Sequence, residues 1–237
     1  MSIVQRFERN RAGRDFVVGD IHGCFGLLNQ AMDKVGFDES RDRLFSVGDL
    51  VDRGPSSHEA IDWIARPWFH AVRGNHEQMA IGVANGRHDH DNYLRNGGGW
   101  FLSLSEDRQR LFAAVFDSLP IAIEINHEVG RVGLVHADIW GDSWDGFIRE
   151  LQSGLSNSKR HKLAEVALWS RSRIQAHQAG YPTAPVSDLH AMFVGHTPVE
   201  RPICLGNVVY IDTGAVFGRS LTLINIADCV SAQAEAA

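Results

Sequence analysis

The sequence has few cysteines, and none of them is spaced for a paired function. Cys24, Cys204 and Cys229 make an odd number, and no two of them form a CxxC pair. Disulfide-dependent secreted domains usually carry an even set of cysteines. We therefore expect free, buried thiols and a protein that works in a reducing compartment, the cytoplasm.

Long apolar runs and an excess of positive charge are also missing. No stretch approaches the roughly 18 consecutive apolar residues of a membrane helix. The opening MSIVQRFERNRAG has no apolar core of signal-peptide length. Lys and Arg total 23 against 29 for Asp and Glu, a net charge of −6. This balance argues against a membrane or nucleic-acid partner held by bulk charge, although it allows a local basic pocket.

What is present is an ordinary globular composition. The 237 residues are 44% hydrophobic and 22% charged, which suits one large domain with a buried core. Short apolar runs recur and end abruptly in polar residues, a pattern typical of strands buried on both faces. These runs lie at 16–18, 44–47, 70–72, 132–135, 191–194 and 208–211.

Helical periodicity appears between the early runs, around 27–35, 61–65 and 111–116. The first third of the chain is therefore a βαβαβ unit, for which parallel strands are expected. The later strands lie closer together, which favours a second, mixed sheet. The region 84–105 breaks the pattern with HDHD and a glycine triplet, and it predicts an irregular or helical insertion over one edge of the fold. We expect HDHD itself to be solvated.

Polar side chains follow five of the apolar runs at the point where each ends. In open α/β sheets, ligands bind outside the carboxyl ends of the strands, so these side chains should converge on one edge. Carboxylate, imidazole and amide groups without a thiolate suit Mn²⁺, Fe²⁺ or Zn²⁺. The candidate ligands are Asp20, His22, Asp49, Asn75, His136 and His196.

These ligands are too many for one open catalytic metal and fit two ions that share a carboxylate. Asp49, from the central GDLVDRGP motif, is the natural bridge. Two ions about 3.5–4 Å apart can clamp both the attacking and the leaving oxygen of a displacement at phosphorus. Glycines precede several of the ligands and would let the backbone approach the metals closely.

Three charged residues next to the ligands have their own expected roles. The fork of Arg53 could hold two phosphate oxygens. Asp52 could orient His76, and an imidazole held in this way and directed away from the metals would act as a general acid for the leaving oxygen. Asp212, in YIDTGAV, is expected to cap or turn a strand end.

The trio GDIHG, GDLVDRG and GNHE, followed by single histidines, resembles the metallophosphoesterases of the phosphoprotein phosphatase type. The resemblance is strongest to the bacteriophage lambda protein phosphatase and its bacterial relatives. It runs from about Phe16 to Asn225 through PWFHAVRGNHEQM, NGGGWF, LVHAD, ALWSR, FVGHTP and YIDTGAVF. It implies a single calcineurin-like domain over 1–237, built as a four-layer α/β/β/α sandwich with a mixed pair of central sheets and with 84–105 as a lid-like insertion.

The resemblance also implies two divalent ions, usually Mn²⁺, with Fe²⁺ or Zn²⁺ as alternatives. One ion would be held by Asp20, His22 and the bridging Asp49, and the other by Asp49, Asn75, His136 and His196. A second phosphate-binding arginine, Arg171, comes from the WxR element. Spacing alone leaves Arg171 and Arg173 equally open. The stretch between LVHAD and ALWSR departs most from the family and leaves the substrate-facing rim open.

The implied activity is hydrolysis of phosphoserine and phosphothreonine in proteins or peptides by in-line attack of a metal-bridging hydroxide. Phosphotyrosine is a further candidate substrate, and the sequence leaves the preference between them open. A symmetrical dinucleoside tetraphosphatase is the alternative, because it shares the three motifs. The HTP that follows Gly195 and the short chain favour the phosphatase. A regulatory module that binds metal without turnover is a third reading, which the presence of His76 and Arg53 disfavours. The sequence does not define an oligomeric state.

Overall fold

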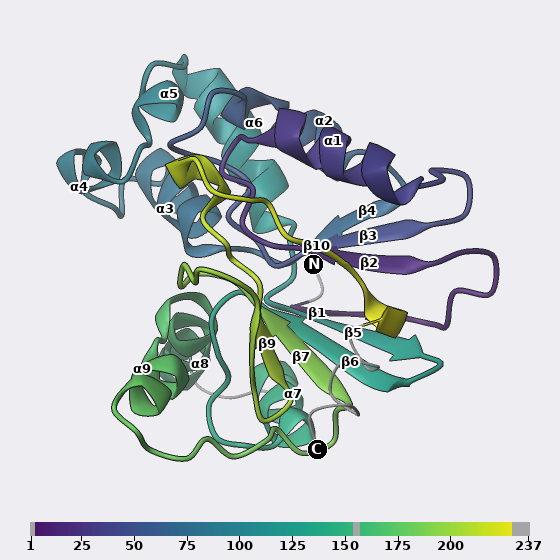
Figure 1. Ribbon diagram of the computed structural model, residues 1–237. Coiled ribbons are helices and arrows are strands. Elements are labelled where there is room, and N and C mark those ends of the chain that lie inside the picture. Colours follow the sequence, from purple (N-terminus) through teal and green to yellow (C-terminus); the bar gives the residue numbers. More distant parts are fainter. Residues whose placement is uncertain (1–2, 154–156, 229–237) are drawn as a thin grey trace.

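Two β-sheets lie face to face at the centre of the molecule (Figure 1). The structure, a computed structural model, describes residues 3–153 and 157–228. One sheet has the strand order β10-β2-β3-β4, and the other has the order β1-β5-β6-β7-β9-β8. The strands of the first sheet are β2 (Asp15–Val18), β3 (Arg43–Ser46), β4 (Phe69–Ala71) and β10 (Leu223–Asn225). Those of the second are β1 (Val4–Phe7), β5 (Ala122–His127), β6 (Gly130–Val135), β7 (Ala191–Val194), β8 (Ile203–Leu205) and β9 (Val208–Tyr210).

Both sheets are mixed. In the first sheet β2, β3 and β4 are parallel, and β10 adds antiparallel to β2. In the second sheet β6, β7 and β9 are parallel, whereas the β5–β6 and β8–β9 pairs are antiparallel. The parallel βαβαβ unit and the second, mixed sheet that the sequence predicts are therefore confirmed.

Helices cover the outer face of each sheet (Figure 1). The first sheet is covered by α1 (Phe25–Val35), α2 (Ala60–Ile64), α3 (Asn75–Ala84) and α6 (Glu106–Asp117). The second is covered by α7 (Trp144–Gln152), α8 (Asn157–Trp169) and α9 (Ser172–Gln178). The result is the expected four-layer α/β/β/α sandwich. Short 3₁₀ turns lie at Ser57–Glu59 and Ala215–Phe217.

The core follows from the two-residue period of the strands. Phe16 and Val18 pack outward against the first helical layer, whereas Val17 between them packs inward against the other sheet. Phe193 of β7 is likewise buried between the sheets. Because alternate side chains serve different layers, a strand that is apolar at every position joins a helical layer to the opposite sheet. This packing fixes the strand ends that carry the site.

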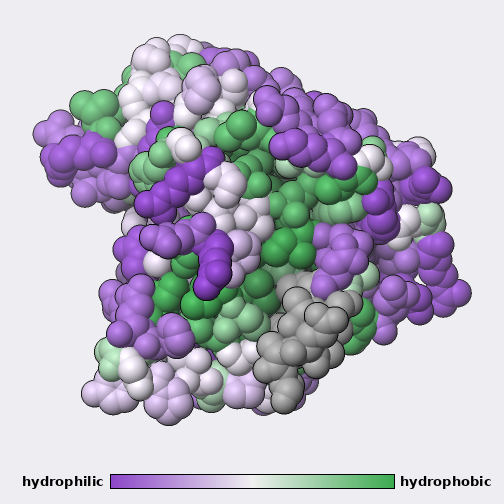
Figure 2. Space-filling view, in the orientation of Figure 1, coloured by the Kyte–Doolittle hydropathy of each residue, from purple (hydrophilic) through white to green (hydrophobic). Residues whose placement is uncertain are grey.

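The insertion at 84–105 is helical rather than irregular. It contains α4 (His90–Arg95) and α5 (Gly99–Leu102). The Asp89 side chain caps α4 by accepting the N–H of Asn92 at 2.6 Å. Figure 2 shows a largely hydrophilic surface over α4, as expected for a solvated HDHD stretch.

The expected burial of the cysteines is wrong for the two that the structure describes. Cys24 is partly exposed and Cys204 is exposed, and Cys229 lies outside the described residues. Cys24 directly follows the GDIHG turn at the end of β2, and Cys204 lies in the edge strand β8, so neither reaches a packed layer. Within residues 3–153 and 157–228, every helix is too short or too polar to cross a membrane.

Candidate functional site

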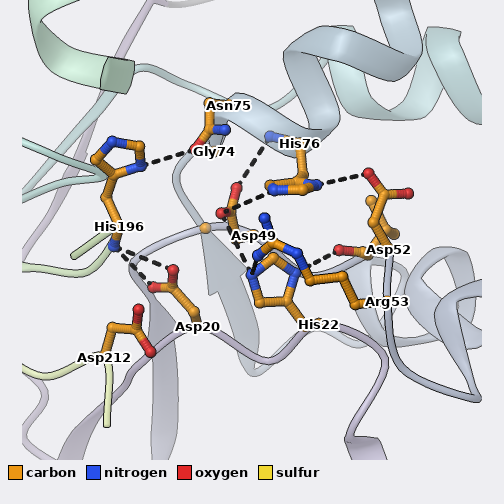
Figure 3. Close-up of polar contacts among 12 residues, drawn as sticks. Asp20, His22, Asp49, Asp52, Arg53, Gly74, Asn75, His76, His196 and Asp212 are labelled. Carbon is orange, nitrogen blue, oxygen red and sulfur yellow. Dashed lines mark hydrogen bonds and ion pairs between the residues drawn. The ribbon is translucent and has the colours of Figure 1, made fainter. Parts of the chain in front are cut away.

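The predicted ligands converge where the carboxyl ends of both sheets meet, and Figure 3 labels all of them except His136. Asp20 and His22 follow β2, Asp49 follows β3, Asn75 begins α3 just beyond β4, His136 follows β6 and His196 follows β7. A pocket of about 240 Å³ opens there. It is lined by Asp20, His22, Asp49, Arg53, Asn75, His76, Asn96, Trp169, Arg171, His196, Pro198, Asp212 and Phe217.

Asp49 lies at the centre of the cluster. Its Oδ2 is 3.6 Å from His22 Nε2 and 3.4 Å from His136 Nε2. Its Oδ1 accepts the backbone N–H of His76 at 3.0 Å. One carboxylate therefore faces imidazoles that arrive from both sheets, as a bridging ligand would.

Asn75 occupies an equivalent position between two histidines. Its Oδ1 lies 2.8 Å from His136 Nε2 and 2.9 Å from His196 Nδ1. The other ring nitrogen, His196 Nε2, is buried, and the backbone of Trp169 lies beside this imidazole and raises its pKa against the effect of burial. Nδ1, on the side of Asn75, is therefore the nitrogen of His196 that faces the group of potential ligands.

The electrostatics of these residues suit cation binding. Burial lowers the pKa of both His22 and His196 to about 3, which leaves their imidazoles neutral near pH 7, the form that binds a metal. Burial opposes ionisation of Asp49, but the imidazoles of His136 and His76 outweigh it and hold the pKa of Asp49 well below its usual range. Asp49 is therefore a carboxylate at neutral pH.

Asp20 is in a different situation. Burial, together with the neighbouring carboxylates of Asp212 and Asp49, raises the pKa of Asp20 well above its usual range. Its two oxygens accept the backbone N–H of His196 at 3.0 and 3.2 Å. A bound cation would offset the repulsion among these carboxylates and favour the ionised form of Asp20.

Two groups of potential ligands share Asp49. One consists of Asp49, His136 and His196, and the other of His22, Asp49 and His76, with the ligand atoms of each group within 4.8 Å of one another. The donor set thus fits two divalent cations with a common carboxylate. The first group agrees with the predicted ligands. The second group contains His76 in place of the predicted ligand Asp20.

The backbone around the ligands is held in uncommon conformations. His22, Asp49 and His196 have φ values of 45°, 50° and 66°, in the left-handed region that non-glycine residues rarely adopt. Such residues persist only where the surroundings fix them, and they concentrate at functional sites.

Glu77 fixes the turn at Asp49, a role that the sequence analysis did not assign. Its fully buried carboxylate accepts the backbone N–H groups of Asp49, Leu50 and Gly74 at 3.0, 2.8 and 2.8 Å. Burial and the charge of Asp49 raise the pKa of Glu77 to about 7. Its place three residues after Gly74, the N-cap residue of α3, has the spacing of a capping box, a signal that could have identified it.

His76 and Asp52 form a buried pair. His76 Nδ1 lies 2.6 Å from Asp52 Oδ2, as predicted for an imidazole oriented by a carboxylate. The other ring nitrogen of His76, however, is 3.9 Å from Asp49 Oδ2. It faces the ligand cluster rather than pointing away from it, because Asp52 anchors the opposite side of the ring.

The arginines divide between two environments. Arg53 lines the pocket with its Nη1 2.7 Å from His22 Nε2, and Arg171 lines it with Nη2 3.4 Å from the His196 carbonyl. Arg173 is buried and bonds to Asp138 at 3.2 Å and to the Ala184 carbonyl at 2.7 Å. Of the two candidates in this element, Arg171 is therefore the one that faces the pocket.

Asp212 has more than the turn role expected for it. Its Oδ1 accepts the N–H of Gly214 at 2.9 Å, which is a turn contact, but the residue also lines the pocket beside Asp20 (Figure 3). The sequence signal that could have indicated this position is an acidic residue directly after the apolar run at 208–211.

Comparison with known proteins supports this picture. The profile of the calcineurin-like phosphoesterases matches residues 16–212. Serine/threonine-protein phosphatase 1 of Salmonella typhimurium is 37% identical over 227 residues, which cover 94% of this chain and 97% of that protein. The symmetrical bis(5'-nucleosyl)-tetraphosphatase of Aromatoleum aromaticum is 31% identical, with coverage of 90% and 93%. The cold-active protein-tyrosine phosphatase of a psychrophilic Shewanella species shares the fold, with a TM-score of 0.57 at 18% identity over 95% of this chain and 78% of that one.

Substitution of Gly74 tests whether the position of Asp49 determines metal binding. A Cβ atom there would lie 2.2 Å from Asp49 Oδ1 and 2.3 Å from its backbone nitrogen, although the φ of −92° suits alanine. We expect Gly74→Ala to displace Asp49 and to weaken Mn²⁺ binding to the metal-free protein about 10–100-fold, as loss of ligand support typically does. Titration calorimetry measures this. The control is Gly26→Ala, where nothing lies within 4 Å of the added Cβ. Unchanged affinity in Gly74→Ala would remove Asp49 from the ligand set.

Proposed function

The chain belongs to the calcineurin-like phosphoesterases, and on that premise we propose that it is a metal-dependent protein phosphatase acting on phosphoserine and phosphothreonine. The observation that carries this proposal is one pocket in which two guanidinium groups, those of Arg53 and Arg171, face the cluster of potential metal ligands. Arginine forks bind phosphate oxygens, and the ligand cluster lies beside them. The similarity to serine/threonine-protein phosphatase 1 over nearly the whole of both chains supports the same substrate class.

The pocket is small and encloses only the phosphoryl end of a substrate. A volume of about 240 Å³ is below the roughly 300–1,000 Å³ typical of pockets that enclose a drug-sized ligand. It accommodates a phosphoryl group and the first atoms of its leaving group. A symmetrical tetraphosphatase, the activity named for the Aromatoleum relative, is the alternative, and the higher identity to serine/threonine-protein phosphatase 1 favours the phosphatase.

Two divalent cations would be held by the six predicted ligands, with Asp49 shared between them. When bound, they would supply positive charge at the phosphoryl oxygens and an activated water. The nitrogen and oxygen donors suit Mn²⁺, with Fe²⁺ and Zn²⁺ as alternatives. The remaining residues would position the substrate: Arg53 and Arg171 would bind the phosphate, and His76, oriented by Asp52, would deliver a proton to the departing alkoxide.

The first test of the function compares substrates on one preparation. Phosphoserine and phosphothreonine peptides, a phosphotyrosine peptide and diadenosine tetraphosphate are offered to Mn²⁺-loaded protein. We expect the highest kcat/KM on the phosphoserine or phosphothreonine peptides, loss of activity on chelation and recovery with Mn²⁺. Asp49→Asn should be the most damaging ligand substitution, because both cations would lose a charged ligand. A higher kcat/KM on the dinucleotide would replace the proposal with its alternative.

The second test addresses the arginines. Arg53→Ala or Arg171→Ala should raise KM for a phosphopeptide and weaken inhibition by inorganic phosphate about 10–100-fold, the effect of losing a hydrogen bond to a charged group. Metal content is measured in each variant, because Arg53 also contacts His22. Arg149→Ala, an exposed arginine on α7, is the control. Inhibition by phosphate that is unchanged in both variants would refute the phosphate-binding role.

The third test separates an acid from a ligand at His76. A proton donor matters most when the leaving group is poor and typically contributes about 10²–10⁴-fold. His76→Asn should therefore lose kcat on a phosphoserine peptide far more than on nitrophenyl phosphate, with both metals retained. Asp52→Asn should show the same pattern more weakly, because it disturbs only the orientation and charge of the imidazole. Loss of a metal from His76→Asn would instead make His76 a ligand, which its distance to Asp49 permits.

A further inference from the structure

The carboxylate of Asp52 is bonded from two sides. Its Oδ2 is 2.6 Å from His76 Nδ1. Its Oδ1 accepts the hydroxyl of Tyr93 at 2.9 Å and the indole N–H of Trp100 at 2.6 Å. Tyr93 belongs to α4 and Trp100 to α5, so both of these donors come from the insertion at 84–105. Asp52 itself is fully buried.

The same segment also holds the backbone next to Asp52. The carbonyl of Gly97 accepts the N–H of Arg53 at 3.3 Å. Asp52 and Arg53 have φ values of 73° and 67°, two consecutive non-glycine residues in the left-handed region. Gly97 approaches so closely that a Cβ there would lie 2.6 Å from the Arg53 nitrogen. The strained dipeptide is thus fixed at its backbone and at its carboxylate by one segment.

The two donors are themselves anchored in the core. Tyr93 is fully buried, its ring lies edge-on to Phe101 at 5.8 Å, and a Cβ on Gly98 would lie 2.4 Å from that ring. The indole of Trp100 packs edge-on against Phe112 of α6 at 5.1 Å. Because packing locks both rings, their polar atoms occupy fixed positions, as a support for a catalytic group requires.

We propose that Tyr93 and Trp100 are positioning residues that fix the Asp52 carboxylate and through it the ring of His76, so that the insertion is a support for the proton donor. Two donors on Oδ1 set the rotation of the carboxylate and leave Oδ2 for the imidazole. In this arrangement His76 carries its proton toward the pocket from a ring that cannot turn. This inference rests on the proposed phosphatase function.

Tyr93→Phe is the test, because it removes one oxygen atom and keeps the buried ring. We expect kcat on a phosphoserine peptide to fall about tenfold, as for the loss of one hydrogen bond to a charged group. KM, metal content and turnover of nitrophenyl phosphate should stay close to those of the parent. Trp100→Phe should likewise lower kcat on the phosphoserine peptide and leave the other quantities unchanged. The double variant Tyr93→Phe/Trp100→Phe should lower this kcat further. Tyr181→Phe, which removes the same atom from a side chain that is 67% exposed, is the control.

A second measurement distinguishes positioning from general damage. In the His76→Asn background, Tyr93→Phe should have no further effect on kcat, because its action passes through the imidazole. An equal loss on both substrates, or the same loss in the His76→Asn background, would overturn the proposal. If the parent shows no phosphatase activity, the proposed function fails instead. The ¹⁵N resonance of His76 Nδ1 then still decides the positioning role: it should shift in Tyr93→Phe and not in Tyr181→Phe, and an unchanged signal overturns it.

Discussion

The attraction between the Asp49 carboxylate and the imidazoles around it is the interaction on which the site depends. Its residues come from the ends of strands in both sheets, so the cluster exists only when the sheets are stacked in register. A carboxylate removed from water is expensive unless other charges and hydrogen bonds compensate it. Asp49 is compensated by neighbouring imidazoles and by the backbone N–H of His76. The unusual turns at the strand ends allow these groups to face one another.

That compensation is incomplete without a cation. Asp20 and Asp212 lie close together in the same pocket, and each has a pKa raised by burial and by neighbouring carboxylates. The imidazole of His196 lines the same pocket. Carboxylates in excess next to neutral imidazoles form an environment of the kind in which divalent cations are the largest favourable charge. Divalent cations would therefore serve both the chemistry expected at phosphorus and the compensation of these buried carboxylates.

The sequence predicted the structure best where one continuous apolar run marked a strand and polar residues followed it directly. Fully apolar runs such as Ala191–Val194 predicted the central strands, and the rule that ligands gather at carboxyl ends brought the residues after them to one edge. Strands such as β1 and β10 were not predicted, because they are short, lie at the edges of their sheets and are only partly buried. The Mn²⁺ preference and the phosphate-binding role of Arg171 stay predictions. The structure shows only that Arg171 faces the pocket and that Arg173 does not.

The residues that were missed share a physical cause. Tyr93 and Trp100 are 41 and 48 positions from Asp52, so no local spacing links them to it. Glu77 is 28 positions from Asp49, and its capping-box spacing to Gly74 gives no indication of that contact. Each donates to or accepts from a residue that is itself bonded to a neighbour in the pocket or lies in the ligand cluster. A motif shows which side chains can bind a cation or move a proton, whereas the groups that hold them are set by packing between elements distant in the chain.

In this protein the insertion at 84–105 is such an element. Its outer surface over α4 is largely hydrophilic (Figure 2), and its inner side supplies two donors to one carboxylate. The segment that the resemblance describes as lid-like thus contacts, through Asp52, the ring of His76 at the edge of the pocket.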